Sequence, residues 1–274
     1  MRLILSRLVR LRLALLNGIA AVGGYFLFPA PAETASCWAA FSGVVLLAAG
    51  GSALNQVLER DLDSLMVRTR LRPLPQEDLT PAAAAAIGGG CILAGLLLLW
   101  GVGGPLPALL GAATLAWYLG VYTPLKRRTP FALTIGAVCG ALPPVIGWCL
   151  AGGNPGDYRV IFLAGLLYLW QIPHFWLFQR RHAEDFRRAG IPLLAVWDKG
   201  SSPAAGLCLL WVAALVAAAM LLPAFGIIDR HIALWFAAFP LPFVIIRRFR
   251  SEAALFAYLN LFPLLVTLAL FVQK

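Results

Sequence analysis

Long apolar segments, separated by short polar ones, follow one another along the whole chain. A helix that crosses the hydrocarbon layer of a bilayer, ~30 Å thick, needs about 20 mainly apolar residues. Nine segments meet that requirement, with approximate bounds 10–29, 36–58, 81–101, 105–124, 130–151, 158–178, 203–223, 231–247 and 253–272. The pattern predicts an all-α, polytopic membrane protein in which residues 1–274 form a single transmembrane domain.

The composition and the positions of the charges narrow the class of protein. Of the 274 residues, 61% are hydrophobic and 12% are charged, which excludes an ordinary soluble domain. The net charge of +10 would suit a nucleic-acid-binding protein. If the N-terminus is cytoplasmic, however, all Lys and Arg residues except Arg159, Arg230 and Lys274 fall in cytoplasmic segments. This asymmetry predicts a cytoplasmic N-terminus, an outside C-terminus and no nucleic-acid partner. We expect the protein in the plasma (inner) membrane of a prokaryote.

The polar stretch after the second apolar segment is rich in charge. Asn55, Glu59 and Asp63 recur every four residues, so on a helix they fall within roughly 80° of one face and can converge on one ligand. Asp61 points elsewhere unless the helix ends before it. The cations that follow are Arg68, Arg70 and Arg72. Carboxylates beside guanidinium groups suit a diphosphate held through Mg²⁺, whereas the alternative is a solvated loop between two membrane helices.

A second polar cluster lies in and after the sixth apolar segment. Its members are Gln171, His174, Phe178, His182 and Asp185, whose spacings place them on one helical face. A Gln and a His within an apolar segment are unfavourable unless they face the interior of a bundle. His174 is therefore either a binding residue or a histidine that is hydrogen-bonded inside the protein.

Two further features lie between these clusters. Lys126, Arg127 and Arg128 follow the fourth apolar segment, where three consecutive cations are either a topological anchor or part of the same polar site as Glu59. The fifth segment contains the pair Pro143-Pro144. Because prolines free backbone carbonyls that need partners inside the protein, this pair predicts a kinked or broken helix beside a cavity.

Four motifs occur in order over roughly residues 50–198. The first is Asn55-x₃-Glu59-Arg60-Asp61-x-Asp63-x₂-Met66-x-Arg68-Thr69-x₂-Arg72-Pro73-Leu74. The others are Tyr122-Thr123 with Lys126-Arg127, then Gly140-Ala141-x-Pro143-Pro144-x₂-Gly147-Trp148, then Pro173-His174-Phe175-Trp176 with Asp185-Phe186-x₂-Ala189-Gly190-Ile191-Pro192. Together they resemble the UbiA-type intramembrane prenyltransferases, and in detail their protohaem IX farnesyltransferase branch. The chain departs from the pattern at Glu59, where many relatives have Asp, at Ala132, where Asn is expected, and in a first segment without Lys-Pro.

The resemblance implies a nine-helix bundle around a central cavity. The implied reaction is a Mg²⁺-dependent transfer of a farnesyl group from farnesyl diphosphate to a vinyl group of haem B, giving haem O. The implied catalytic residues, which hold Mg²⁺, are Asn55, Glu59, Asp63 and Asp185. The implied substrate-binding residues are Arg68, Arg72, Tyr122, Lys126, Arg127 and His174.

The resemblance also implies contact with membrane lipid and, as partners, other enzymes of haem A and terminal oxidase assembly. Two alternatives remain open from the residues themselves. One is a related prenyltransferase that acts on an aromatic or quinone precursor. The other is a membrane transporter, because transporters also combine broken helices with polar groups at membrane depth.

Overall fold

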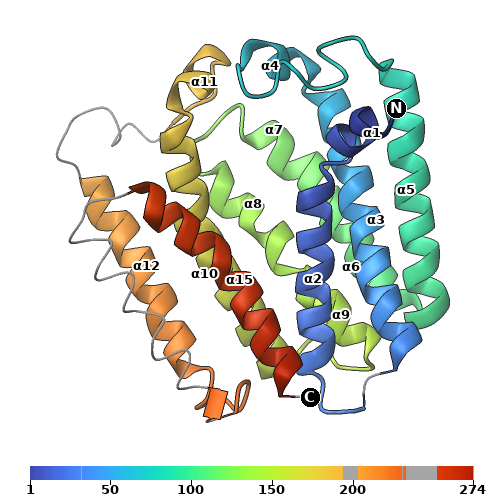
Figure 1. Ribbon diagram of the computed structural model, residues 1–274, viewed down its shortest axis with the longest axis vertical. Coiled ribbons are helices and arrows are strands. Elements are labelled where there is room, and N and C mark those ends of the chain that lie inside the picture. Colours follow the sequence, from blue (N-terminus) through green and yellow to red (C-terminus); the bar gives the residue numbers. More distant parts are fainter. Residues whose placement is uncertain (32, 194–202, 230, 233–251, 274) are drawn as a thin grey trace.

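The computed structural model describes residues 1–31, 33–193, 203–229, 231–232 and 252–273, and all regular structure in these residues is helical (Figure 1). The elements before the fifth predicted span are α1 (Arg2–Leu8), α2 (Leu11–Leu27), α3 (Thr34–Leu58), α4 (Arg60–Leu65), α5 (Pro81–Gly103), α6 (Pro105–Ala116), η1 (Trp117–Tyr122) and α7 (Thr123–Leu125). They are followed by α8 (Ala132–Ala141), α9 (Pro143–Leu150), α10 (Tyr158–Arg181), α11 (Ala183–Arg188), α12 (Pro203–Leu221) and α15 (Glu252–Val272).

Eight of the nine predicted spans coincide with these helices. α2, α3, α5, α10, α12 and α15 each match one span, whereas α6, η1 and α7 together form the fourth and α8 and α9 the fifth. The eighth predicted span, 231–247, lies outside the described residues. Within the described part of the chain, six helical segments are long and apolar enough to cross a membrane. The prediction of an all-α, polytopic membrane fold is confirmed.

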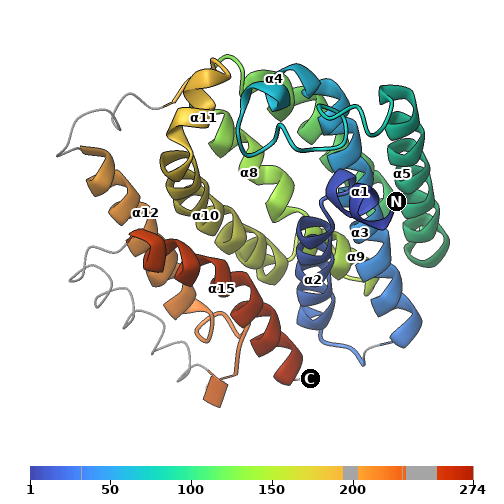
Figure 2. The same cartoon turned by 45° about the horizontal axis from the view of Figure 1, so that its top comes forward.

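The two ends of the bundle carry different structures. α1, α4 and α11 lie at the end where the chain begins, and the C-terminus lies at the opposite end (Figure 1). When the first end is turned forward, α4 and α11 are seen next to each other (Figure 2). An apolar cluster of Leu62, Met66, Phe186, Ala189 and Ile191 joins them. The two polar segments noticed in the sequence thus form one cover over the same end of the bundle.

The fourth span changes its winding near its end. Residues Trp117–Tyr122 form a π-helical turn, η1, between α6 and α7. Single π turns inside α-helices are frequent at functional sites. Pro124 follows and lacks a backbone N–H, while the Thr123 hydroxyl donates a hydrogen bond of 2.8 Å to the carbonyl oxygen of Tyr118. The turn places the rings of Tyr118 and Tyr122 in a stack, with centroids 5.9 Å apart.

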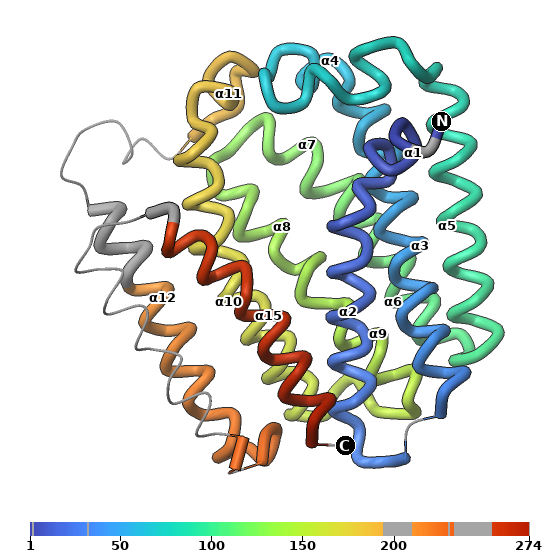
Figure 3. Tube along the Cα trace, viewed as in Figure 1, coloured from blue at the N-terminus to red at the C-terminus, as the bar shows by residue number. Residues whose placement is uncertain are grey.

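The fifth span is broken at its proline pair, as predicted. α8 ends at Ala141 and α9 begins at Pro143, and the change of direction can be followed in Figure 3. α9 packs closely against α2 at Gly147. A Cβ atom on Gly147 would lie 1.8 Å from the carbonyl oxygen of Ala21, so the crossing requires glycine. This contact fixes the position of α9 against α2.

Aromatic contacts join α10 to α15. Pro263 lies inside α15 and cannot donate a hydrogen bond to the carbonyl of Leu259. Trp170 Nε1 of α10 takes that place and donates to the Leu259 oxygen at 2.5 Å. His174 stacks on Trp170 and on Phe256 of α15, with centroid distances of 4.9 and 5.0 Å. The sandwich fixes the plane of the His174 imidazole.

Candidate active site

A cavity of about 430 Å³ lies inside the bundle. Much of its wall is apolar, including Leu47, Leu115, Leu133, Ile146, Leu167 and Phe175. The polar end lies beneath the cover formed by α4, α11 and the loop that follows α4. Eight of the ten predicted site residues line the cavity, namely Asn55, Glu59, Asp63, Arg68, Arg72, Tyr122, Lys126 and His174. Segments far apart in the sequence therefore meet at one site.

The acidic residues are presented by a broken helix. α3 ends at Leu58, Glu59 adopts φ −119° and ψ 18°, and the six-residue helix α4 follows. Asn55, Glu59 and Asp63 are nevertheless brought together, with exposures of 4%, 2% and 2%. The Asn55 side-chain nitrogen donates to Glu59 Oε2 at 3.0 Å and to Thr123 Oγ1 at 3.2 Å. The three residues therefore line the same cavity, as predicted, but from the two sides of a helix break and not from one continuous helix.

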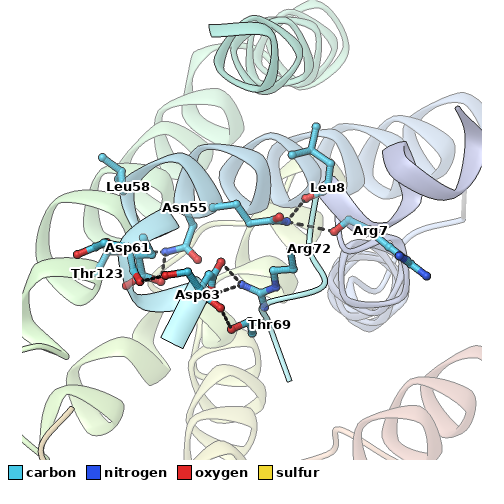
Figure 4. Close-up of polar contacts among 12 residues, drawn as sticks. Arg7, Leu8, Asn55, Leu58, Asp61, Asp63, Thr69, Arg72 and Thr123 are labelled. Atoms are coloured by element: carbon cyan, nitrogen blue, oxygen red, sulfur yellow. Dashed lines mark hydrogen bonds and ion pairs between the residues drawn. The ribbon is translucent and has the colours of Figure 1, made fainter. Parts of the chain in front are cut away.

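Each buried carboxylate has a cation beside it. Lys126 Nζ donates to Glu59 Oε2, and Arg72 Nη1 donates to both oxygens of Asp63 at 2.8 and 2.6 Å. Figure 4 shows Asp63 facing Arg72. Burial lowers the pKa of Lys126, and the attraction of Glu59 opposes that effect only in part. Both ion pairs lie in the wall of the cavity. A ligand that enters the cavity can therefore replace either partner of a pair.

The residues present fit a magnesium ion. Glu59 Oε1 is buried without a hydrogen-bond partner in the described structure, and Asp63 keeps lone pairs beyond the two that Arg72 uses. No group of three His, Cys, Asp or Glu side chains that could hold a metal occurs among the described residues. Mg²⁺ is commonly held by one or two carboxylates together with substrate phosphates and water, so two carboxylates and an amide satisfy its requirements.

Arg68 lies in the loop that follows α4 and lines the cavity. Its guanidinium lies 5.0 Å from the centroid of the Phe178 ring. Arg68 is exposed, but the protein atoms around its guanidinium remove part of its hydration. This desolvation lowers the Arg68 pKa to about 10. It remains charged at neutral pH and adds positive charge where an anionic ligand would lie.

Asp185 and Arg127 are not among the residues that line the cavity. Asp185 accepts hydrogen bonds from the backbone N–H groups of Val67 and Arg68, at 2.9 and 3.1 Å. Burial alone would raise the Asp185 pKa, but these two bonds and nearby cations bring it below the usual value. In this structure Asp185 does not line the cavity but orders the loop that carries Arg68, and its role as a metal ligand stays a prediction.

Arg127 contacts the outer side of the break in α3. It forms two hydrogen bonds to Asp61, of 2.8 and 3.0 Å, and one of 3.0 Å to the carbonyl oxygen of Leu58. The bonds to Arg127 lower the pKa of Asp61. Asp61 does not line the cavity, although the helix breaks before it and the spacing predicts this only for a continuous helix. Arg127 is held by this contact and does not line the cavity, and its role in substrate binding stays a prediction.

The predicted face of α10 lies against the cavity. Gln171 is buried, and its side-chain nitrogen donates to the carbonyls of Ala137 and Leu167 at 3.0 Å each, so it braces α8. His174 lines the cavity, and its Nδ1 is buried without a partner among the described residues. The sequence left open that His174 is held by a hydrogen bond inside the protein, but no hydrogen bond to its Nδ1 is observed among the described residues.

Three residues that line the cavity were missed by the sequence reasoning. Tyr118 is one turn before Tyr122, a spacing that could have identified it. Gln179 is 5% exposed, and its Oε1 is buried without a partner in the described part of the chain. Arg10 precedes α2 in a left-handed conformation, with φ 48°. Backbone strain of this kind cannot be read from a basic N-terminal segment.

Comparison with known proteins identifies the family of this chain. Residues 16–271 match the UbiA prenyltransferase family. A protein of Geobacter sulfurreducens described as protoheme IX farnesyltransferase is 62% identical over 266 residues, which are 97% of each chain. A protein of Oleidesulfovibrio alaskensis with the same description is 43% identical over 81% of this chain and 78% of its own.

Solved structures have the same fold. An apo UbiA homologue from Aeropyrum pernix superposes with a TM-score of 0.75 and 21% identity, covering 96% of this chain and 98% of its own. A UbiA homologue from Archaeoglobus fulgidus bound to GPP and Mg²⁺ superposes with a TM-score of 0.71 and 16% identity over 98% of both chains. The four sequence motifs, the fold and the family match agree, and the chain belongs to the UbiA prenyltransferase family.

Proposed function

We propose that this protein transfers a farnesyl group from farnesyl diphosphate to a vinyl group of haem B, giving haem O. The observation that carries the proposal is the pair of buried carboxylates, Glu59 and Asp63, facing cations at the polar end of an otherwise apolar cavity. The 62% identity to a protoheme IX farnesyltransferase over nearly the whole chain supports this substrate pair.

Asn55, Glu59 and Asp63 are the residues that would hold Mg²⁺. The unpartnered Glu59 Oε1 and the second lone pairs of Asp63 supply the oxygens, and a UbiA homologue of the same fold is bound to GPP and Mg²⁺. A bound Mg²⁺ would neutralise charge on the diphosphate oxygens and so assist carbon–oxygen cleavage. Thr123 accepts a hydrogen bond from the Asn55 nitrogen, which orients the amide so that its oxygen remains available.

The cations of the site bind and orient the diphosphate. Lys126 and Arg72 each pair with one carboxylate and lie within the cavity wall. Arg68 extends from the loop that Asp185 orders. Guanidinium groups match phosphate geometry with two parallel hydrogen bonds, so these side chains fix the leaving group in one orientation.

The remainder of the cavity excludes water. An allylic cation formed on cleavage reacts with water unless the site is dry, and the apolar wall provides that protection. The stacked rings of Tyr118 and Tyr122 lie in the same wall and can interact favourably with positive charge. His174, with its ring plane fixed by Trp170 and Phe256, is a polar group available to haem in the region between α10 and α15.

The substrate assignment is tested by the product. Purified protein supplied with farnesyl diphosphate, haem B and MgCl₂ is expected to release diphosphate and to form a haem whose mass gain contains one farnesyl group. Diphosphate release with an aromatic or quinone precursor, and none with haem, would instead establish a different acceptor.

Arg68→Ala is expected to weaken farnesyl diphosphate binding by about 1.5–3 kcal/mol, the scale of one charge-assisted hydrogen bond, and to leave haem affinity nearly unchanged. Equilibrium binding of each substrate measures the two effects separately. Arg70→Ala is the matched control, because Arg70 carries the same charge in the same loop but does not line the cavity. Equal losses for Arg68→Ala and Arg70→Ala would show that only the net charge matters.

We place the end that carries α1, α4 and α11 in the cytoplasm of a prokaryote, with the C-terminus outside. The support is the distribution of Lys and Arg, together with the opposite positions of the two termini in Figure 1. Reporter fusions after Gln76 and Arg128 are expected to report cytoplasm, and fusions near Asn154 and Lys274 the other side. A cytoplasmic reporter at Lys274 would contradict nine spans.

A further inference from the structure

The contact of Arg127 with α3 and α4 lies outside the cavity and has no part in the binding steps above. Arg127 Nη1 and Nη2 bond to the two oxygens of Asp61, and Nη2 also bonds to the Leu58 carbonyl. A single guanidinium thus joins the last residue of α3 to the first turn of α4. The neighbouring residue, Lys126, contacts Glu59 from within the cavity. The break in the helix is therefore held from both sides by consecutive cations.

α4 requires an external hold because it has only six residues. A helix of this length is unstable by itself, since each end leaves backbone groups without intrahelical partners. At the junction Asp63 N–H still donates to the Glu59 carbonyl at 2.8 Å, whereas the Leu58 carbonyl accepts from Arg127. The direction in which α4 leaves the junction decides whether Asp63 reaches the cavity.

We propose that Asp61 and Arg127 are positioning residues, which fix the angle between α3 and α4 so that Asp63 and Glu59 converge on the metal-diphosphate ligand. This inference rests on the proposed function for the identity of that ligand. It gives separate roles to two carboxylates that are only two residues apart: Asp63 faces the ligand, and Asp61 holds the helix that carries Asp63. It also explains why the cation next to Lys126 is an arginine, because a planar fork can bond a carboxylate and a carbonyl at once.

The pair can be tested by a double-mutant cycle with Asp61→Asn, Arg127→Gln and the double variant. The first measurement is amide hydrogen exchange of residues 60–66 in the substrate-free protein. The second is the Mg²⁺ concentration that gives half-maximal diphosphate release, together with kcat. Glu77→Gln is the matched control. Glu77 follows α4 in the chain and forms an exposed ion pair, at 3.1 Å, with Arg60 of α4.

Each single variant is expected to accelerate exchange in α4 and to raise the half-maximal Mg²⁺ concentration about tenfold, the lower end of the range for losing a residue that orients a metal ligand. The double variant is expected to lose no more than either single variant, and Glu77→Gln to behave as wild type. Asp61→Arg combined with Arg127→Asp is expected to recover part of the loss.

Two results would overturn the proposal. One is unchanged exchange of residues 60–66 in both single variants. The other is a loss of diphosphate affinity in Arg127→Gln with no effect in Asp61→Asn, which would make Arg127 a direct ligand. If the wild-type protein releases no diphosphate, the proposed function fails, and the exchange measurement still decides whether the pair fixes α4.

Discussion

Asp63→Asn is expected to lower turnover by more than the roughly 10–100-fold that follows the loss of a residue that only orients a metal ligand. The substitution keeps the size and polarity of the side chain but removes the charge that Mg²⁺ requires. Asp63 is 2% exposed in the cavity wall, where no other carboxylate on α4 can replace it, since Asp61 points away. The protein should still insert into the membrane and bind haem, which steady-state kinetics and haem titration measure.

Asp61→Asn is the internal control for this prediction. It removes a charge two residues away on the same short helix. Turnover should therefore fall only about tenfold, in line with a positioning role for Asp61. A structural loop would give a different pattern, with changes in stability of about 0.5 kcal/mol or less and no change in turnover for either variant. Near-normal activity of Asp63→Asn at saturating Mg²⁺ would defeat the metal assignment, and a larger defect in Asp61→Asn would mean that Asp61 is the ligand.

Lys126→Met is expected to destabilise the ligand-free protein by about 3–5 kcal/mol, because it leaves the buried Glu59 carboxylate without its cation. Glu59 is 2% exposed and its Oε1 has no partner in the described structure, so loss of Lys126 leaves the charge poorly solvated. Adding Mg²⁺ should restore much of the stability, since the metal would neutralise the same carboxylate. Thermal unfolding in detergent, with and without MgCl₂, measures both effects.

Two variants separate this explanation from a general loss of packing. Arg128→Met removes an exposed cation two residues after Lys126. It should leave the unfolding temperature unchanged with and without MgCl₂. Lys126→Met combined with Glu59→Gln removes both charges and should recover stability without Mg²⁺. Equal unfolding temperatures for Lys126→Met and Arg128→Met, with no response to Mg²⁺, would show that Glu59 is not charged in the ligand-free protein.

The positions of the membrane helices and of most site residues could be predicted because hydrophobic length and helical spacing are local properties of the sequence. The spacing of Asn55, Glu59 and Asp63 predicts convergence, and these residues do converge. The pair Pro143-Pro144 predicts the break between α8 and α9, because proline removes backbone donors wherever it occurs.

The directions of individual side chains could not be predicted, because they depend on contacts between distant segments. Lys126 and Arg127 are adjacent in the sequence, yet one points into the cavity and the other to the outer side of α3. Asp185 belongs to the second polar cluster, but its oxygens are held by amides 117 and 118 residues earlier in the chain. The sequence around the helix break at Glu59 contains no proline or glycine that would predict it. Contacts with Arg127 and Lys126 stabilise the break.

The central claim is that Glu59 and Asp63 hold a metal-bound diphosphate at the polar end of the cavity. The most direct measurement is a crystal structure with Mn²⁺, in place of Mg²⁺, and a non-hydrolysable farnesyl thiodiphosphate. The account predicts an anomalous peak within coordination distance of Glu59 and Asp63, with the thiodiphosphate contacting Arg68 and Lys126. A metal peak at Asp61 or elsewhere outside the cavity, with both Glu59–Lys126 and Asp63–Arg72 pairs intact, would contradict it.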